Sequence, residues 1–177
     1  MGGSAVSVGD SSVVFHFSDP ALEASARQAV ARELGPQVDA SVPADLAAAY
    51  DELRSPVTDL VYGSRCYESG EAPRGRASLE ALRRAGRFDL IGNVARGMNP
   101  TARVYAAEAI LDHGALSAAD AQTIAKIRAL KTSIAACSGC NTRDESADAL
   151  QPVRTPVGPR NAHNGRYVTH RLLAGTI

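Results

Sequence analysis

The residues best suited to chemistry in this 177-residue chain are its three cysteines, Cys66, Cys137 and Cys140. Cys137 and Cys140 form a Cys-x-x-Cys motif, which can serve a structural, a redox or a metal-binding purpose. We favour the structural use. In an exported protein, a disulfide would join Cys66 to the Cys137–Cys140 turn, or the two thiols of the motif would pair with each other. The odd number of cysteines leaves at least one thiol free in a monomer, and free thiols throughout are the plain alternative.

The surroundings of the motif disfavour its redox and zinc uses. A redox Cys-x-x-Cys normally opens a helix after a strand, because the helix dipole lowers the thiol pKa, whereas this motif follows a predicted helix. A zinc site would take His163 and His170 as its other ligands, but their spacing falls outside the zinc-finger pattern and they lie in a predicted tail. We therefore predict no metal site and no cofactor.

Motifs of the common enzyme classes are missing from the sequence. It contains no glycine-rich phosphate-binding loop, no Gly-x-Ser-x-Gly and no His-Glu-x-x-His. His113 follows Asp112 at a predicted helix end, where the helix dipole alone accounts for a protonated imidazole. The chain is predicted to have no catalytic residues and to be no enzyme.

The candidate binding residues are arginines and one tyrosine, because these types dominate the hot spots of protein interfaces. Two of them stand out as large polar residues among alanines, and three more cluster around a neighbouring short helix. We expect one partner-binding surface, with a solvated helix face as the plain alternative. The five residues are Arg83, Arg84, Arg87, Arg103 and Tyr105.

Charge is segregated along the chain although its formal net charge is zero. Residues 1–60 hold nine acids against three arginines, and residues 74–103 hold seven arginines against two acids. Two solvated faces that attract each other within one domain account for this, and a charged partner on one face is the sharper alternative. Nucleic-acid binding through the arginine-rich segment 74–103 is therefore the alternative function.

The elements that must position these residues are predicted to be helices. Caps and breakers define one helix from Pro20 to Gly35-Pro36, a second from Pro43 to Ser55-Pro56 and a third over 77–85. The stretch from Gly86 to Leu130 predicts three more, joined by very short turns, so that neighbours pack antiparallel. The fold class is therefore all-α, a compact bundle of about six short helices.

The remaining segments are predicted to be less regular. Val57 to Tyr67 is consistent with another short helix. Ser4 to Ser12 is predicted to be a flexible lead-in, and Val13 to Phe17 a single β-like run with no partner strand. We place a helical domain at 1–140 and an irregular or partly disordered C-terminal tail at 141–177.

Two resemblances follow from this pattern of short helices. The antiparallel pairs resemble HEAT- and armadillo-like helical units. The small helical body without an assembled active site also resembles small bacterial immunity proteins. The second resemblance implies a protein-binding module that blocks a secreted toxin or effector enzyme with a rigid helix face.

The sequence contains no run of 18 apolar residues, which predicts that no segment spans a membrane. Met1-Gly2-Gly3-Ser4 is typical of residues added during cloning. If a native leader was replaced there, the cysteines slightly favour a periplasmic or exported location over a cytoplasmic one.

Overall fold

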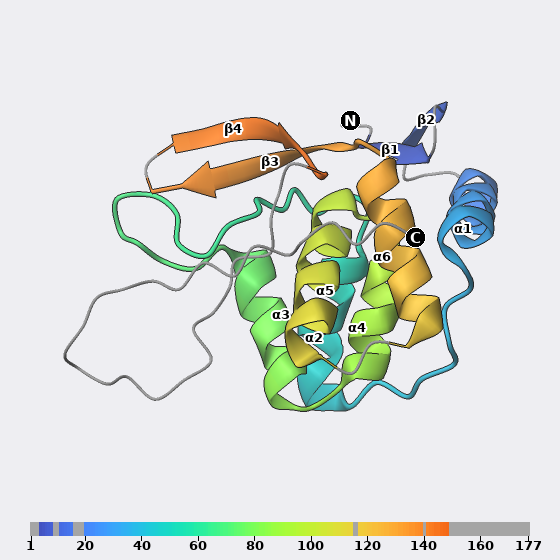
Figure 1. The fold of residues 1–177 in the computed structure, drawn as a ribbon, viewed down its shortest axis with the longest axis horizontal. Helices are drawn as coiled ribbons and strands as arrows, with labels where there is room; N and C mark the ends of the chain where they lie inside the picture. Colours follow the sequence, from blue (N-terminus) through green and yellow to red (C-terminus); the bar gives the residue numbers. More distant parts are fainter. Residues whose placement is uncertain (1–3, 9–10, 16–19, 115–116, 140, 149–177) are drawn as a thin grey trace, which may run out of the picture.

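The computed structural model describes residues 4–8, 11–15, 20–114, 117–139 and 141–148, with side chains from residue 20 onward. Six helices and two antiparallel β-hairpins form this part of the chain (Figure 1). The mostly helical fold is confirmed, but the fold is not purely all-α. In chain order the elements are β1 Ser4–Val8, β2 Ser11–Phe15, α1 Pro20–Leu34, α2 Ala44–Arg54, α3 Arg74–Arg84, α4 Phe88–Ala95, α5 Pro100–His113, α6 Ala118–Ala129, β3 Ser133–Ser138 and β4 Asn141–Ser146.

Helix α5 is the centre of the helical body, because every residue from Thr101 to Ile110 is buried. The side chain of Asn99 caps its start by accepting a hydrogen bond from the Ala102 amide at 3.0 Å. Gly114 ends it in the left-handed conformation at φ 76°. Many of its side chains are alanine methyls, so α3, α4, α6 and β3 can all approach closely.

Helices α2, α3 and α4 form one side of the core around α5. Leu46, Tyr50 and Leu53 recur at helical spacing on α2 and are buried against its neighbours. Leu79 and Leu82 on α3 are fully buried. Each leucine removed from water in this way stabilises the fold by about 1.5–3 kcal/mol.

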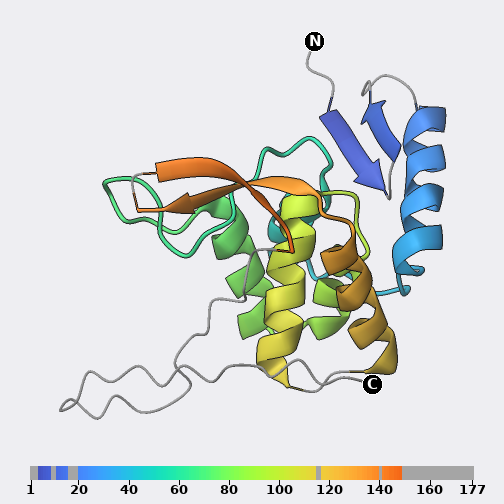
Figure 2. The ribbon, with the colours of Figure 1, turned by 45° about the horizontal axis from the view of Figure 1, so that its top comes forward.

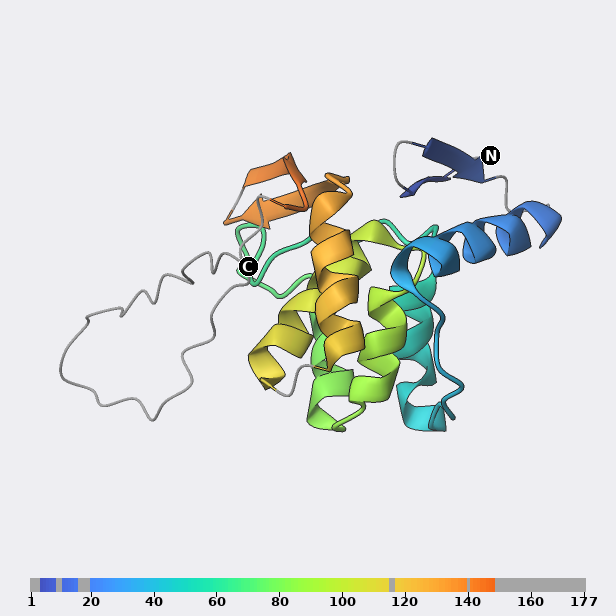
Figure 3. The same ribbon diagram turned by 45° about the vertical axis from the view of Figure 1, so that its right-hand side comes forward.

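Helix α1 lies at the side of the body, where it packs on α6 (Figure 3). Two side chains of α6 hold its last turn: Thr123 Oγ1 donates to Leu34 O at 3.0 Å and Lys126 Nζ to Glu33 O at 2.6 Å. These bonds use carbonyls that the helix end leaves without intrahelical partners.

The N-terminal prediction of a flexible lead-in and a lone strand is wrong. Strands β1 and β2 pair antiparallel, with Ala5 opposite Val14 and Ser7 opposite Ser12, and lie beside α1 (Figure 2). Strand β1 has five residues, and only Val6-Ser7-Val8 alternates apolar with polar residues, which is too short a run to predict a strand.

The C-terminal boundary at residue 140 is also wrong, because it cuts through a second hairpin. Strands β3 and β4 pair from Ser133–Ser146 to Ser138–Asn141 and lie across one end of the helices (Figure 2). Ile134 and Ala136 are buried, which anchors β3 on the body. Residues 149–177, the remainder of the predicted tail, lie outside the described residues.

The segment between α2 and α3 contains no helix, contrary to the prediction for Val57 to Tyr67. Its backbone runs parallel to β3: Tyr62 N donates to Ala135 O and Cys137 N to Tyr62 O, both at 2.8 Å. Its apolar residues Leu60 and Tyr62 are buried as extended chain rather than as a helix face. Strand β3 therefore has neighbours on both edges.

Candidate functional site

The two residues predicted to anchor a partner, Arg103 and Tyr105, are not on the surface. Their exposed fractions are 1% and 0%. Arg103 donates to the carbonyls of Gly97 at 2.7 Å and Met98 at 3.2 Å, just past the end of α4. Burial lowers the pKa of Arg103 to about 10. Because α5 is covered on all sides, this part of the predicted binding surface is wrong.

The three other predicted arginines lie at the end of α3 and in the turn that follows. Arg83 is paired with Glu80 and Asp112, at 3.4 Å each. Arg87 binds Asp89 and donates to the carbonyl of Ser41, both at 2.6 Å. Arg84 is exposed. The structure thus leaves these three residues less buried than Arg103 and Tyr105 and engages two of them internally.

Carboxylates from other elements pair with further arginines of the arginine-rich segment. Arg74 pairs with Glu52 of the acidic first 60 residues at 3.4 Å. Arg96 pairs with Asp120 at 3.0 Å. Of these two pairs, Arg74–Glu52 alone joins the acidic first 60 residues to the arginine-rich segment. The pairs leave fewer cations available for a phosphate backbone than the sequence indicates.

Among the predicted disulfide candidates, Cys66 and Cys137 are bonded, with their Cα atoms 5.7 Å apart. Cys140 lies outside the described residues, as do the zinc candidates His163 and His170. Within the described part of the chain, no three metal-binding side chains gather into a possible site.

The disulfide pins an exposed loop that we take as the candidate functional site: residues 64–72, here called the pinned loop. Backbone bonds fix it further, with Cys66 N donating to Glu71 O at 2.9 Å and Tyr67 N to Gly139 O at 2.8 Å. Tyr67 lies next to the bonded cysteine with 54% of its surface exposed. Its φ of 62° is rare for a bulky residue, and such strain is typical of functional sites.

A buried polar network fixes the chain that leads into the pinned loop. Arg76 forms a bidentate ion pair with Glu108, in which both hydrogen bonds are 2.8 Å long. The Nε of Arg76 donates to the carbonyl of Gly63 at 3.1 Å. The Tyr62 hydroxyl donates to Glu108 at 3.0 Å. The network therefore joins α3 and α5 to the chain that leads into the pinned loop.

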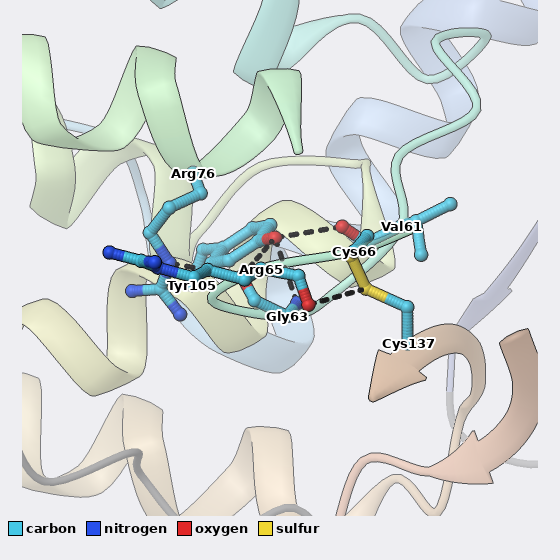
Figure 4. Close-up of a disulfide and its surroundings, with 7 residues drawn as sticks. All are labelled: Val61, Gly63, Arg65, Cys66, Arg76, Tyr105 and Cys137. Carbon is cyan, nitrogen blue, oxygen red and sulfur yellow. Dashed lines mark hydrogen bonds between the residues drawn. A yellow bond between two sulfur atoms is a disulfide. The ribbon is translucent and has the colours of Figure 1, made fainter. Parts of the chain in front are cut away.

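Tyr105 completes this support. Its hydroxyl accepts from Gly63 N at 3.0 Å and donates to Val61 O at 2.7 Å (Figure 4). Its ring packs on Tyr62 with centroids 4.9 Å apart, and the Arg76 guanidinium lies 4.6 Å from its centre. Tyr105 thus positions the loop's entry rather than contacting a partner.

Tyr62, Arg76 and Tyr105 of this network keep their protons at neutral pH. Burial raises the pKa of Tyr105 to about 12. Burial and then the charge of Glu108 raise the pKa of Tyr62 further. Burial acts to lower the pKa of Arg76, but its bond to Glu108 and the charge of that carboxylate outweigh burial and raise it. Both hydroxyls therefore remain donors and Arg76 remains charged.

Gly63 lets the loop approach the disulfide closely. A Cβ at this position would overlap Cys137 Sγ and lie 3.0 Å from the Cys137 carbonyl oxygen. Any larger residue would push β3 away from the loop.

A small cavity beside the network has a volume of about 20 Å³ and is lined by Tyr62, Glu108 and apolar side chains of α5 and α6. A space of this size holds about one water molecule. The geometry therefore favours a structural role for the network.

The sequence did not single out Tyr67, because this residue was predicted to end a short helix rather than to lie in an exposed loop. The available signal was an aromatic residue directly after Cys66 in a segment, 64–72, otherwise made of Ser, Arg, Glu, Gly and Ala. A cysteine beside an aromatic residue in a polar loop is consistent with a fixed loop that presents that ring.

Comparison with protein-family models, with curated proteins and with solved structures finds no match to this chain. The resemblances to HEAT-like units and to immunity proteins therefore remain predictions. No helix among the described residues has both the length and the apolar character needed to cross a bilayer.

Proposed function

We propose that this chain is a non-enzymatic protein-binding module that uses the pinned loop, with Tyr67 as its anchor. The observation that carries the proposal is a half-exposed tyrosine in a strained conformation, held between a disulfide and two backbone hydrogen bonds. Tyrosine contributes large contact area with few rotatable bonds, and it is among the residues that dominate binding hot spots.

The rigidity of the pinned loop supports this proposal energetically. A free loop loses conformational entropy when a partner orders it, and that loss lowers affinity. Here the ordering has already occurred on folding, because Cys66 is bonded to Cys137 and the Arg76–Glu108 pair holds Gly63. The loop therefore loses little conformational entropy when a partner binds it.

A bacterial immunity protein is the concrete version that we propose, with a secreted toxin or effector enzyme as the partner. A structural disulfide fits an oxidising compartment such as the periplasm. In this version the pinned loop, rather than the helix face that we expected from sequence, would enter and block the enzyme's cleft.

The test is a pull-down from lysate of the source organism with the purified chain, eluted with salt and read by mass spectrometry. We expect one stoichiometric protein, retained by Leu22→Ala and lost with Tyr67→Ala. Leu22 is a matched control because it is a large, partly exposed apolar residue on α1, away from the loop. A partner captured equally by both variants would contradict the role of the loop.

Experiments with the same purified chain distinguish the alternative, nucleic-acid binding, from the protein-binding proposal. Its affinity for duplex DNA or RNA should fall steeply with salt, because counterions are released on binding. Binding at low salt that is lost when Arg84 is replaced by Glu would favour it over the protein-binding proposal.

A further inference from the structure

We propose that the Cys66–Cys137 disulfide is a redox switch for the pinned loop: a dithiol reductant releases residues 64–72 while the helical body stays folded. The bond joins the loop to β3 (Figure 4). The loop is therefore held in place in an oxidising compartment and released in a reducing one. The regulatory consequence, a change in affinity for a partner, rests on the proposed function of this loop.

Cys66 is the residue that anchors the loop. Within residues 64–72, all of which the structure describes, Cys66 alone is buried, with 0% of its surface exposed. Two hydrogen bonds of the loop are internal, from Cys66 N to Glu71 O at 2.9 Å and from Gly70 N to Tyr67 O at 3.2 Å. Water competes with such bonds where the backbone is exposed. Without the disulfide, the loop therefore has little buried surface to hold it.

The conformation of Tyr67 favours release. Its φ of 62° lies in the left-handed region, which costs free energy for a residue with a large side chain. Two constraints hold it there: the disulfide at the preceding residue, and the hydrogen bond from Tyr67 N to Gly139 O at 2.8 Å. Reduction removes the covalent constraint, so Tyr67 can return to a negative φ, and that rotation displaces the loop.

The segments on either side of the bond are held independently of it. Gly63 N donates to the Tyr105 hydroxyl at 3.0 Å, and Gly63 O accepts from Arg76 at 3.1 Å. On the other side, Ile134 and Ala136 fix β3 by their burial. These contacts involve neither sulfur atom. Reduction therefore frees the loop locally and leaves the helices and β3 in place.

The two sulfur atoms differ in access, because Cys66 is fully buried whereas Cys137 is partly exposed. One thiolate of the dithiol attacks Cys137 Sγ, since exchange needs direct approach to a sulfur. The S–S bond breaks, and its electron pair passes to Cys66 Sγ, which takes up a proton. The second thiol of the reductant, after losing its proton, displaces Cys137 from the mixed disulfide. The products are two protein thiols and the oxidised dithiol.

The experiment is hydrogen exchange read by mass spectrometry on the Cys140→Ser chain, before and after reduction with dithiothreitol. The substitution removes the third thiol, which could pair with a released one. We expect the amides of residues 64–72 to exchange faster after reduction by about tenfold or more, while the circular dichroism spectrum is unchanged and α5 remains protected. A chain with Cys66→Ser and Cys137→Ser should exchange at the fast rate with or without dithiothreitol.

A monothiol tests which sulfur is attacked. Treatment with glutathione, followed by acid quenching and peptide mapping, should place the mixed disulfide on Cys137 and leave Cys66 as a free thiol. Adducts mainly on Cys66 would overturn the proposal, because that sulfur is reached only when the loop is already open. Equal exchange of the loop before and after reduction would overturn it, as would reduction that occurs only in denaturant or that unfolds the helices.

None of these measurements requires a partner, so they decide the switch even if the pull-down recovers no protein. A partner captured equally by the oxidised chain and by the Cys66→Ser, Cys137→Ser chain would leave the protein-binding proposal intact. That result would overturn the disulfide as the regulator of the loop.

Discussion

Arg76 and Glu108 are buried side chains whose charges are met almost entirely by each other. The exposed fractions of the two side chains are 10% and 3%, and the two hydrogen bonds between them are both 2.8 Å long. Taking such a pair out of water costs nearly as much as its attraction returns, so the intact pair adds little net stability. Removing one member is different, because the other is left as an uncompensated charge.

We therefore expect Glu108→Gln to lower the free energy of unfolding by about 3–5 kcal/mol, measured by urea denaturation. Glu80→Gln is the control. Glu80 is a partly exposed partner of Arg83, and its loss should change stability by no more than about 0.5 kcal/mol. Equal effects of the two substitutions would show that the buried pair does not support the loop in the way described.

At the scale of elements, the Cys66–Cys137 bond joins the loop before α3 to β3, across 71 residues of sequence. The bond adds to backbone contacts already present, since Tyr62 and Tyr67 donate hydrogen bonds to residues of the second hairpin. Its main effect is on the unfolded chain, whose freedom it limits. The disulfide thus stabilises the same arrangement that presents Tyr67.

Replacing Cys66 and Cys137 by Ser should lower the free energy of unfolding by up to about 4 kcal/mol, the chain-entropy value for a loop of this length. Guanidinium denaturation with and without a reducing agent measures this. Cys140→Ser is the matched control and should leave stability unchanged under oxidising conditions. A stability loss as large in the control would mean that Cys140, not Cys66, is bonded to Cys137.

For the whole molecule, burial falls off from α5 outwards. Helix α5 is enclosed by α3, α4, α6 and β3, whereas α1 contacts α6 and the first hairpin at the side of the body (Figure 3). Elements with few buried contacts open locally, without unfolding of the whole molecule.

Hydrogen exchange read by mass spectrometry should follow this order. We expect the amides of α5 to exchange slowest, at the rate of global unfolding, and those of α1 to exchange much faster. Exchange of α1 and α5 at the same rate over a range of denaturant concentrations would show a single cooperative unit instead.

The helices were predictable from sequence because their signals are local. Asn99-Pro100 and Ser117 cap the starts of α5 and α6 through bonds to amides only three residues away. Gly114 ends α5 because it adopts a positive φ at little cost. Such contacts lie within one turn of helix, so both partners are only a few positions apart in the sequence.

The hairpins and the candidate site depended on the tertiary structure. The pairing of β3 with the chain at Tyr62 joins residues more than 70 positions apart, and no local pattern of residues specifies it. Tyr105 and Tyr67 are the same residue type, yet one is fully buried and the other half exposed. The sequence by itself thus determined the capped ends of helices such as α5 and α6. The assembled packing decided which arginines are neutralised, which cysteines meet and which tyrosine faces solvent, because burial depends on every element that surrounds a side chain.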